Sequence, residues 1–124
     1  MRNITIADDD YVFSTVLQLR FEERGYRVRA AHDGHELLCQ LETRQPDLLL
    51  LDLMMPGLSG IEVLRRLGED PQLRLIPVVV MTSCSDSRTR ARCLELGADG
   101  FYAKPFSPRQ LAADVERRLA PQRG

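Results

Sequence analysis

The sequence predicts one α/β domain, a doubly wound parallel sheet of five strands covered by helices on both faces. Three observations predict this fold class. Five short strand-like segments alternate with five helix-like segments along the 124 residues, two of the strand-like segments are apolar at nearly every position, and glycine or proline stands at most of the joints. Parallel neighbours need crossover connections, and helices between the strands would supply them.

The first half of the chain contains two strand–helix units. Residues 3–7 are predicted to form a short strand, and the helix after it ends at Gly25. Residues 26–31 alternate apolar and polar as in a half-covered strand, and Asp33 can cap a second helix that the Gln-Pro pair at 45–46 ends. The apolar residues at helical spacing are Phe13, Val16, Leu17 and Phe21 in the first helix and Leu37, Leu38 and Leu41 in the second.

The second half continues the alternation. Residues 48–52 are apolar up to Asp52, as expected for a strand covered on both faces, and Ser59 can cap the helix that follows. The apolar positions of that helix are Ile61, Val63, Leu64 and Leu67. The remaining predicted elements are strands over residues 77–82 and 100–103, a helix over residues 86–95 ended by Gly97, and a last helix over residues 107–119.

Composition limits the function classes. The sequence is 44% hydrophobic and 28% charged with a formal net charge of −1, so it has no global positive field for nucleic acid or membrane. Its apolar runs are far too short to span a bilayer, and its first residues do not resemble a signal peptide. We therefore expect a cytoplasmic protein that binds neither nucleic acid nor membrane directly. Residues 1–120 are assigned to the one domain, and 121–124 to a loose tail or the start of a linker.

The three cysteines do not indicate a disulfide framework. Cys39, Cys84 and Cys93 are odd in number and form no C-x-x-C pair. This pattern gives little support to a disulfide scaffold or a zinc site. We expect reduced, mostly buried thiols.

Polar groups stand where the predicted strands end. The first strand runs into Asp8, Asp9 and Asp10, and the third ends at Asp52. In open parallel sheets, ligands bind beyond the carboxyl ends of the strands. Crowded carboxylates repel one another, and a divalent cation reverses that balance. Because the site offers oxygen ligands, the predicted ion is Mg²⁺ or Mn²⁺.

Two further strand ends add a hydroxyl and a positive charge. Thr82 ends the fourth strand and Lys104 follows the fifth. Together with a metal ion, these groups could surround the anionic oxygens of a phosphoryl group. Asp52 would then be the nucleophile that forms an aspartyl-phosphate, and the leucines before it would hold it on a rigid strand.

Four motifs occur in order within residues 2–119: IADDD, LLLLDLMMPGLSG, VVVMTS and GADGFYAKPF. Through them the sequence closely resembles the receiver domain of two-component response regulators. By this resemblance the phosphoacceptor is Asp52. The metal site would comprise Asp9 as the direct ligand, Asp52 itself, the backbone carbonyl of Met54 and, in support, Asp8.

The resemblance also assigns a switch. Lys104 and Thr82 would act at the phosphoryl group, and Thr82 and Phe101 would change position when the group is present. It implies the strand order 2-1-3-4-5 and a cis peptide bond between Lys104 and Pro105.

The implied activity is phosphoacceptance, with self-catalysed phosphorylation and slow dephosphorylation, and not that of a turnover enzyme. The phosphoryl donor would be a histidine kinase or a phosphotransfer protein. The output would be a changed binding face, built by the fourth helix, fifth strand and fifth helix, for an unknown downstream protein. The same face could serve a homodimer. Met54 and Cys84, each two positions from a site residue, cannot orient a water well, so we expect slow hydrolysis of the aspartyl-phosphate.

Other interpretations account for single features. The three consecutive aspartates could cap the first helix, and the HDGHE segment at 32–36 lacks metal-site spacing and fits a surface turn with a helix cap. Haloacid-dehalogenase-like hydrolases need a second acid where Met54 stands, and a flavodoxin-like nucleotide site would not place three aspartates against phosphate. A degenerate receiver that acts only as an interaction module is the remaining alternative.

Overall fold

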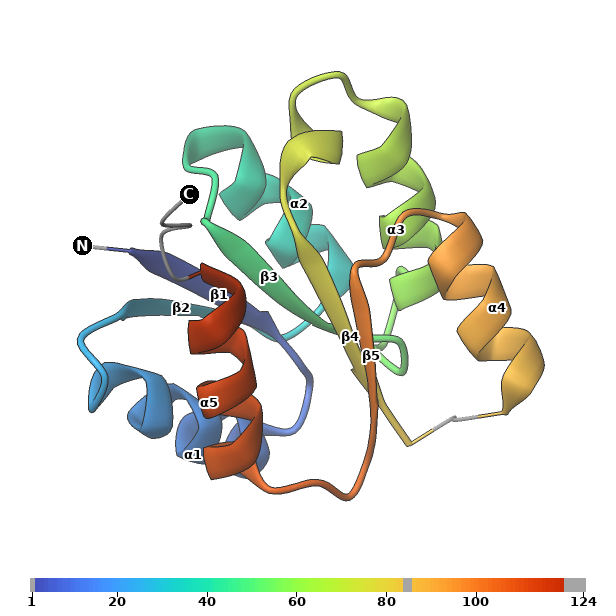
Figure 1. The fold of residues 1–124 in the computed structure, drawn as a ribbon. Coiled ribbons are helices and arrows are strands. Elements are labelled where there is room, and N and C mark those ends of the chain that lie inside the picture. Colours follow the sequence, from blue (N-terminus) through green and yellow to red (C-terminus); the bar gives the residue numbers. More distant parts are fainter. Residues whose placement is uncertain (1, 84–85, 120–124) are drawn as a thin grey trace, which may run out of the picture.

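The protein is described here by a computed structural model that covers residues 2–83 and 86–119. Its five strands form one sheet, and Figure 1 shows the sheet between two layers of helices. Strands and helices alternate along the chain, as predicted. In chain order, the elements are β1 (Asn3–Ala7), α1 (Tyr11–Glu22), β2 (Arg27–Ala31), α2 (Gly34–Thr43), β3 (Leu48–Asp52), α3 (Gly60–Glu69), η1 (Leu73–Leu75), β4 (Val78–Thr82), α4 (Ser87–Glu95), β5 (Gly100–Ala103) and α5 (Pro108–Leu119).

All strand pairs of the sheet are parallel, and the order is β2-β1-β3-β4-β5, which confirms the predicted topology. From β1 the chain first adds β2 on one side and then β3 on the other. Ala7 is in register with Leu51, so the residues that follow β1 lie beside the end of β3. A crevice for a ligand is expected at such a reversal of strand order.

The leucine run of β3 is apolar because helices cover both faces of the sheet. Leu48 and Leu50 belong to the core under α1 and α5, whereas Leu49 and Leu51 belong to the core under α2, α3 and α4. Figure 1 shows these two helical layers on opposite faces. Every residue of β3 is buried, Asp52 included. Burying each leucine side chain contributes about 1.5–3 kcal/mol, so this strand anchors the centre of the sheet.

Side-chain oxygens begin four of the helices. Asp10, Asp33, Ser59 and Asp86 each accept a hydrogen bond from the backbone N–H three residues later. The caps predicted at Asp33 and Ser59 are confirmed. Such a cap satisfies an N–H group that has no partner within the helix. Glycines of positive φ stand in the turns after two of the helices, Gly25 at +90° after α1 and Gly97 at +102° after α4, a conformation that other residues adopt at a cost.

Some predicted boundaries were one residue too early. β2 begins at Arg27 because the amide of Tyr26 donates to the carbonyl of Phe21 in the turn after α1. β4 begins at Val78, and α5 begins at Pro108 with the Ser107 hydroxyl accepting from Gln110. The short helix η1 was not predicted, since three residues are too few to show a period.

Two expectations about side chains are met in part, because α1 buries Leu17 and Phe21 but not Val16, and one of the two described cysteines is buried. Val16 is 37% exposed, and Ser14 takes a buried place on α1 with its hydroxyl donating to the carbonyl of Tyr11. Cys39 is exposed, whereas Cys93 is buried and Cys84 lies outside the described residues. No helix within the described ranges is long and apolar enough to cross a membrane.

Candidate functional site

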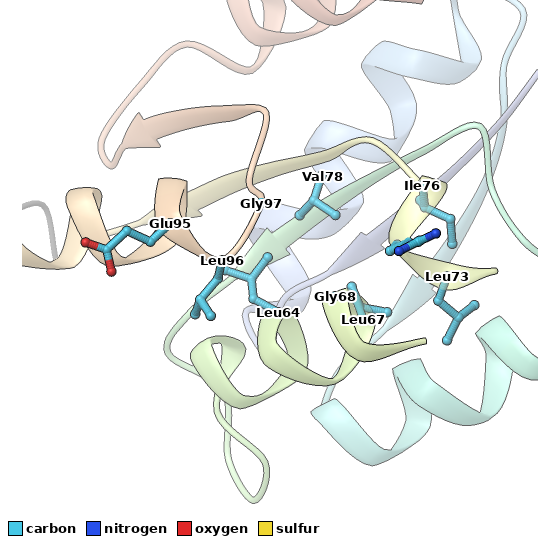
Figure 2. Close-up of a pocket in the computed structure, with 10 residues that line it drawn as sticks. Leu64, Leu67, Gly68, Leu73, Ile76, Val78, Glu95, Leu96 and Gly97 are labelled. Carbon is cyan, nitrogen blue, oxygen red and sulfur yellow. The ribbon is translucent and has the colours of Figure 1, made fainter. Parts of the chain in front are cut away.

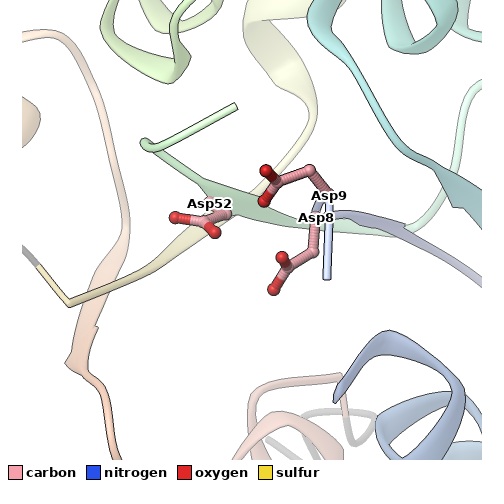
Figure 3. A group of neighbouring side chains, drawn as sticks. All are labelled: Asp8, Asp9 and Asp52. Atoms are coloured by element: carbon pink, nitrogen blue, oxygen red, sulfur yellow. The ribbon is translucent and has the colours of Figure 1, made fainter. Parts of the chain in front are cut away.

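Three carboxylates gather where β1 and β3 end (Figure 3). Asp8 and Asp9 follow the last residue of β1, and Asp52 is the last residue of β3. Each offers a carboxylate oxygen, and these oxygens lie within 4.8 Å of one another. Asp8 is fully buried, Asp52 is 4% exposed and Asp9 is open to solvent. The cluster therefore extends from the sheet interior to the surface.

Lys104 places its ammonium between two of these carboxylates. Its Nζ lies 2.8 Å from Oδ2 of Asp8 and 3.2 Å from Oδ2 of Asp52. Its backbone N–H donates to the carbonyl of Thr82 at 2.8 Å, which fixes the loop after β5 to the end of β4. The peptide bond from Lys104 to Pro105 is cis, as the resemblance implied. The two contacts of the Lys104 ammonium with Asp8 and Asp52 are charge-assisted hydrogen bonds, which are stronger than hydrogen bonds between neutral groups.

Burial controls the charge of Asp52. Loss of solvation raises the pKa of the Asp52 carboxyl from 3.8 to about 6, and the neighbouring Asp8 charge adds to the rise. The Met54 N–H and the Lys104 ammonium act in the opposite direction. Burial lowers the pKa of Lys104, but its hydrogen bond to Asp8 and the charge of Asp52 outweigh burial, so the net shift is upward. The pair thus keeps opposite charges at neutral pH.

The turn after β3 orients Asp52. The backbone N–H of Met54 donates to Oδ1 of Asp52 at 3.0 Å, which leaves Oδ2 to Lys104. The turn returns so closely to the strand that a Cβ at Gly60 would lie 2.5 Å from Cα of Leu53 and 2.7 Å from the carbonyl oxygen of Asp52. The glycine in LSG is therefore required by this close approach. The Met54 side chain is 58% exposed beside the site.

Thr82 and Phe101 lie on neighbouring strands. Thr82 ends β4, fully buried, and is in register with Ala103 of β5. Phe101 is half-buried and packs against the core under α2, α3 and α4. The Arg90 guanidinium of α4 stands 5.8 Å from the centre of the Phe101 ring. Cys84, two positions after Thr82, lies outside the described residues.

Two residues near the site were not predicted from the sequence. The Phe13 ring of α1 lies 4.5 Å from Nζ of Lys104. The Nδ1 atom of His32 lies 2.9 Å from the carbonyl oxygen of Asp8, and the His32 ring stacks on Tyr11 at 3.8 Å between ring centres. The pairing of β1 with β2 explains the histidine contact, because His32 follows Ala31, the register partner of Ala7. Asp33 in the same segment is the helix cap that was expected.

The three consecutive aspartates after β1 have different roles. Asp8 pairs with Lys104, and Asp9 presents its carboxylate beside Asp52. Asp10 is the N-cap of α1, and its own backbone N–H donates to Oδ1 of Asp8 at 2.9 Å. The helix-cap interpretation of this run therefore holds for its third member only.

A hollow of about 250 Å³ lies at the other end of the sheet, between the end of α3, η1 and the end of α4 (Figure 2). Leucines 64, 67, 73 and 96 line it, and Arg74 and Glu95 are its charged members. Val78, the first residue of β4, is also in its lining, so this hollow is separated from Asp52 by the length of the strands.

The donor atoms of the acidic cluster fit a hard divalent cation. Within residues 2–83 and 86–119, the one group of three or more His, Cys, Asp or Glu side chains that could hold a metal ion is Asp8, Asp9 and Asp52. All three offer carboxylate oxygens, which suit Mg²⁺ or Mn²⁺, whereas zinc and copper favour nitrogen and sulfur. The ammonium of Lys104 beside this cluster suits an anionic ligand.

Comparison with known proteins gives the same family from sequence and from structure. The sequence pattern of the response regulator receiver domain matches residues 4–116. The chain is 41% identical over 118 residues to the alkaline phosphatase synthesis transcriptional regulatory protein PhoP of Bacillus subtilis (strain 168), a match to 95% of this chain and 48% of that protein. It is 38% identical over 116 residues to the phosphate regulon transcriptional regulatory protein PhoB of Rhizobium meliloti (strain 1021), a match to 94% of this chain and 51% of that one.

A solved structure extends the likeness to three dimensions. The signal receiver domain of a signal transduction histidine kinase from Syntrophus aciditrophicus superimposes with a TM-score of 0.87 at 37% identity, covering 96% of this chain and 90% of that one. This chain spans about half the length of the curated relatives it matches. By sequence pattern and by fold, this chain belongs to the response regulator receiver domain family.

Proposed function

We propose that this receiver accepts a phosphoryl group on Asp52. The observation that supports the proposal best is the position of the Lys104 ammonium, 2.8 Å from Asp8 and 3.2 Å from Asp52, beside three carboxylates clustered within 4.8 Å. An ion pair that served only to stabilise the fold would need one carboxylate beside Lys104, and it would not need the exposed carboxylate of Asp9. The cluster instead suits a site that receives a cation and an anion together.

The cation would be Mg²⁺ or Mn²⁺, held by Asp9, Asp52 and the backbone carbonyl of Met54, with Asp8 in support. When bound, such an ion supplies positive charge that draws phosphoryl oxygens into the site and offsets charge that develops on them. The chain itself supplies the nucleophile and the lysine.

The transfer is a displacement at phosphorus. A carboxylate oxygen of Asp52 attacks the phosphorus atom in line, and the new P–O bond forms as the bond to the leaving group breaks. The electron pair of that bond stays with the leaving group, which is acetate for acetyl phosphate or a neutral imidazole, after proton uptake, for a phosphohistidine. With a pKa of about 6, Asp52 is mostly ionised at neutral pH and ready to attack.

Lys104 is the residue placed to stabilise the phosphoryl oxygens. Its Nζ already donates to Oδ2 of Asp52, so a group attached to this carboxylate would meet the ammonium at hydrogen-bond distance. The buried Thr82 hydroxyl at the neighbouring strand end would supply a further donor.

The same phosphoryl group would drive a switch. Drawing Thr82 toward phosphate would leave space for Phe101 to turn inward from its present half-buried position. Phe101 has no hydroxyl, so its contribution would be its packing. The affected surface would be α4, β5 and α5. On this surface Asp114 accepts from the Tyr102 hydroxyl at 2.9 Å and Arg118 donates to the Asp99 carbonyl at 3.2 Å.

The donor would be a histidine kinase or a phosphotransfer protein in the cytoplasm. The curated relatives are transcriptional regulatory proteins about twice as long as this chain. The switched α4-β5-α5 surface would pass on the signal by binding a downstream protein or a second copy of this chain. The chain would phosphorylate itself from the donor and lose the group slowly, without acting as a turnover enzyme.

Intact-mass spectrometry after incubation with acetyl phosphate tests the proposal. We expect one added phosphoryl group on the native chain with Mg²⁺, none with a chelator and none on Asp52→Asn. Asp33→Asn is the matched control, because Asp33 caps α2 and is not a member of the cluster, and asparagine caps equally well. If neither acetyl phosphate nor phosphorylated kinases label the native chain, a degenerate receiver that acts only as an interaction module is the better account.

A further inference from the structure

We infer that Phe13 is a positioning residue that holds the Lys104 ammonium toward Asp52 through the face of its ring. The inference rests on the proposed function, since it concerns the lysine that would meet the phosphoryl group. Nζ of Lys104 lies 4.5 Å from the centre of the Phe13 ring, well within the range of a cation–π interaction. The ring is thus a third neighbour of the ammonium, after Asp8 and Asp52.

The Phe13 ring is held from both ends. Its backbone N–H donates to Oδ1 of the helix cap Asp10 at 2.9 Å, so the third aspartate of the run fixes the turn that presents the ring. Phe106 packs edge-to-face against Phe13, with ring centres 5.4 Å apart and planes at 84°. Phe106 lies two residues after Lys104 in the chain, and Tyr102 lies two residues before Lys104. The ring centres of Tyr102 and Phe106 are 5.9 Å apart. These aromatic contacts brace α1 against the segment that carries the lysine.

The ring differs from the two carboxylates in one respect. Asp8 and Asp52 are also residues that would hold the cation, so a bound ion competes with Lys104 for their oxygens. The Phe13 face offers the ammonium an attraction that the ion does not remove. The Lys104 side chain is only 19% exposed, and cation–π attraction strengthens when the cation is shielded from water. Because lysine has a flexible four-carbon stem, a fixed partner beside its end narrows the positions that the ammonium samples.

The electrostatic part of this contact can be separated from packing. Phe13→Leu keeps an apolar side chain and removes the aromatic face. Pentafluorophenylalanine placed at Phe13 keeps the shape of the ring and reverses its quadrupole. With acetyl phosphate and saturating Mg²⁺, we expect either change to slow phosphorylation of Asp52 about fivefold. The matched control is Phe21→Leu, on the same helix and in the same apolar cluster, whose ring packs edge-to-face on Tyr26 at 5.9 Å.

Lysine NMR provides a readout that a purely structural role would not change. Lys104 is the only lysine in the sequence, so ¹³C-lysine labelling gives one set of side-chain signals. In the native chain we expect the Hε protons to be shifted upfield by the ring current of Phe13. The shift should disappear in Phe13→Leu and persist in Phe21→Leu.

The outcomes are distinguishable. A native phosphorylation rate in Phe13→Leu, an equal loss in Phe21→Leu, or an unshifted Hε signal in the native chain would overturn the inference and leave the proposed function intact. A native chain that no donor phosphorylates would overturn the proposed function, and with it the role of Phe13.

Discussion

Replacement of Asp52 by asparagine should make the folded protein more stable at neutral pH, although it removes the proposed phosphoacceptor. Asp52 is 4% exposed and lies beside the buried Asp8, and loss of solvation raises the pKa of its carboxyl from 3.8 to about 6. Above pH 6 the folded chain must carry a charge that the unfolded chain carries at lower cost. Asparagine has nearly the same shape and no charge.

The magnitude follows from the pKa shift. A rise from 3.8 to about 6 corresponds to about 3 kcal/mol of unfavourable ionisation in the folded state. This net shift already includes the attraction of the Lys104 ammonium, which lies 3.2 Å from Asp52 and lowers the pKa. We therefore expect the free energy of unfolding at pH 8 to rise by up to about 3 kcal/mol.

The sign of the pH dependence is fixed by the direction of the shift. A carboxyl whose pKa is raised in the folded state favours folding when it is protonated. This contribution is complete below pH 4 and is lost as the pH rises through about 6. The advantage of Asp52→Asn over the native chain should therefore be absent at pH 4 and complete above pH 7.

Urea unfolding followed by circular dichroism at several pH values measures this difference. Asp33→Asn serves as the control, with an expected change below about 0.5 kcal/mol at every pH. A gain of equal size at pH 4 and pH 8 would show that burial of the charge is not its cause. Absence of any gain at pH 8 would refute the raised pKa.

Three further changes test the site and the turn that orients it. Gly60→Ala should destabilise the fold by about 1–3 kcal/mol in urea unfolding, because its Cβ would lie 2.5 Å from Leu53 Cα. Gly68→Ala in the same helix should instead stabilise the fold by about 0.5–1 kcal/mol, because its Cβ would lie 3.6 Å from the nearest atom. Lys104→Gln should slow phosphorylation by acetyl phosphate about 100-fold in a mass-spectrometric time course, and an unchanged rate would remove the lysine from the mechanism. Met54→Asn should speed loss of the phosphoryl group several-fold after removal of the donor, because the amide can orient a water; unchanged decay would count against this role.

The alternation of patterns was enough to predict the strands, the α-helices α1 to α5 and the fold class, but not the short helix η1. The leucine run of β3 has the pattern of a strand covered on both faces, and helices do cover both faces. Caps at Asp33 and Ser59 were predicted because their side chains satisfy local N–H groups, which depends only on nearby residues. Starts misplaced by one residue, as at Tyr26, came from hydrogen bonds in turns that no periodicity reveals.

The members of the site were predictable because strand ends meet at one edge of a parallel sheet. Asp8, Asp9, Asp52 and Lys104 were expected to converge, and the structure places them together. Phe13 and His32 were not expected, since each has an ordinary place in an amphipathic segment or a turn. Their roles depend on contacts between elements that are distant in the chain.

The sequence by itself determined the order of the elements, the covered strands and the identity of the acidic and basic side chains at the strand ends, because these follow from local periodicity and composition. Tertiary structure alone decided the charge state and the neighbours of those side chains. The raised pKa of Asp52 depends on how far packing removes it from water, and the ammonium of Lys104 lies against Phe13 because α1 and the segment after β5 are packed together. Desolvation and distance are properties of the assembled fold, and no pattern along the chain contains them.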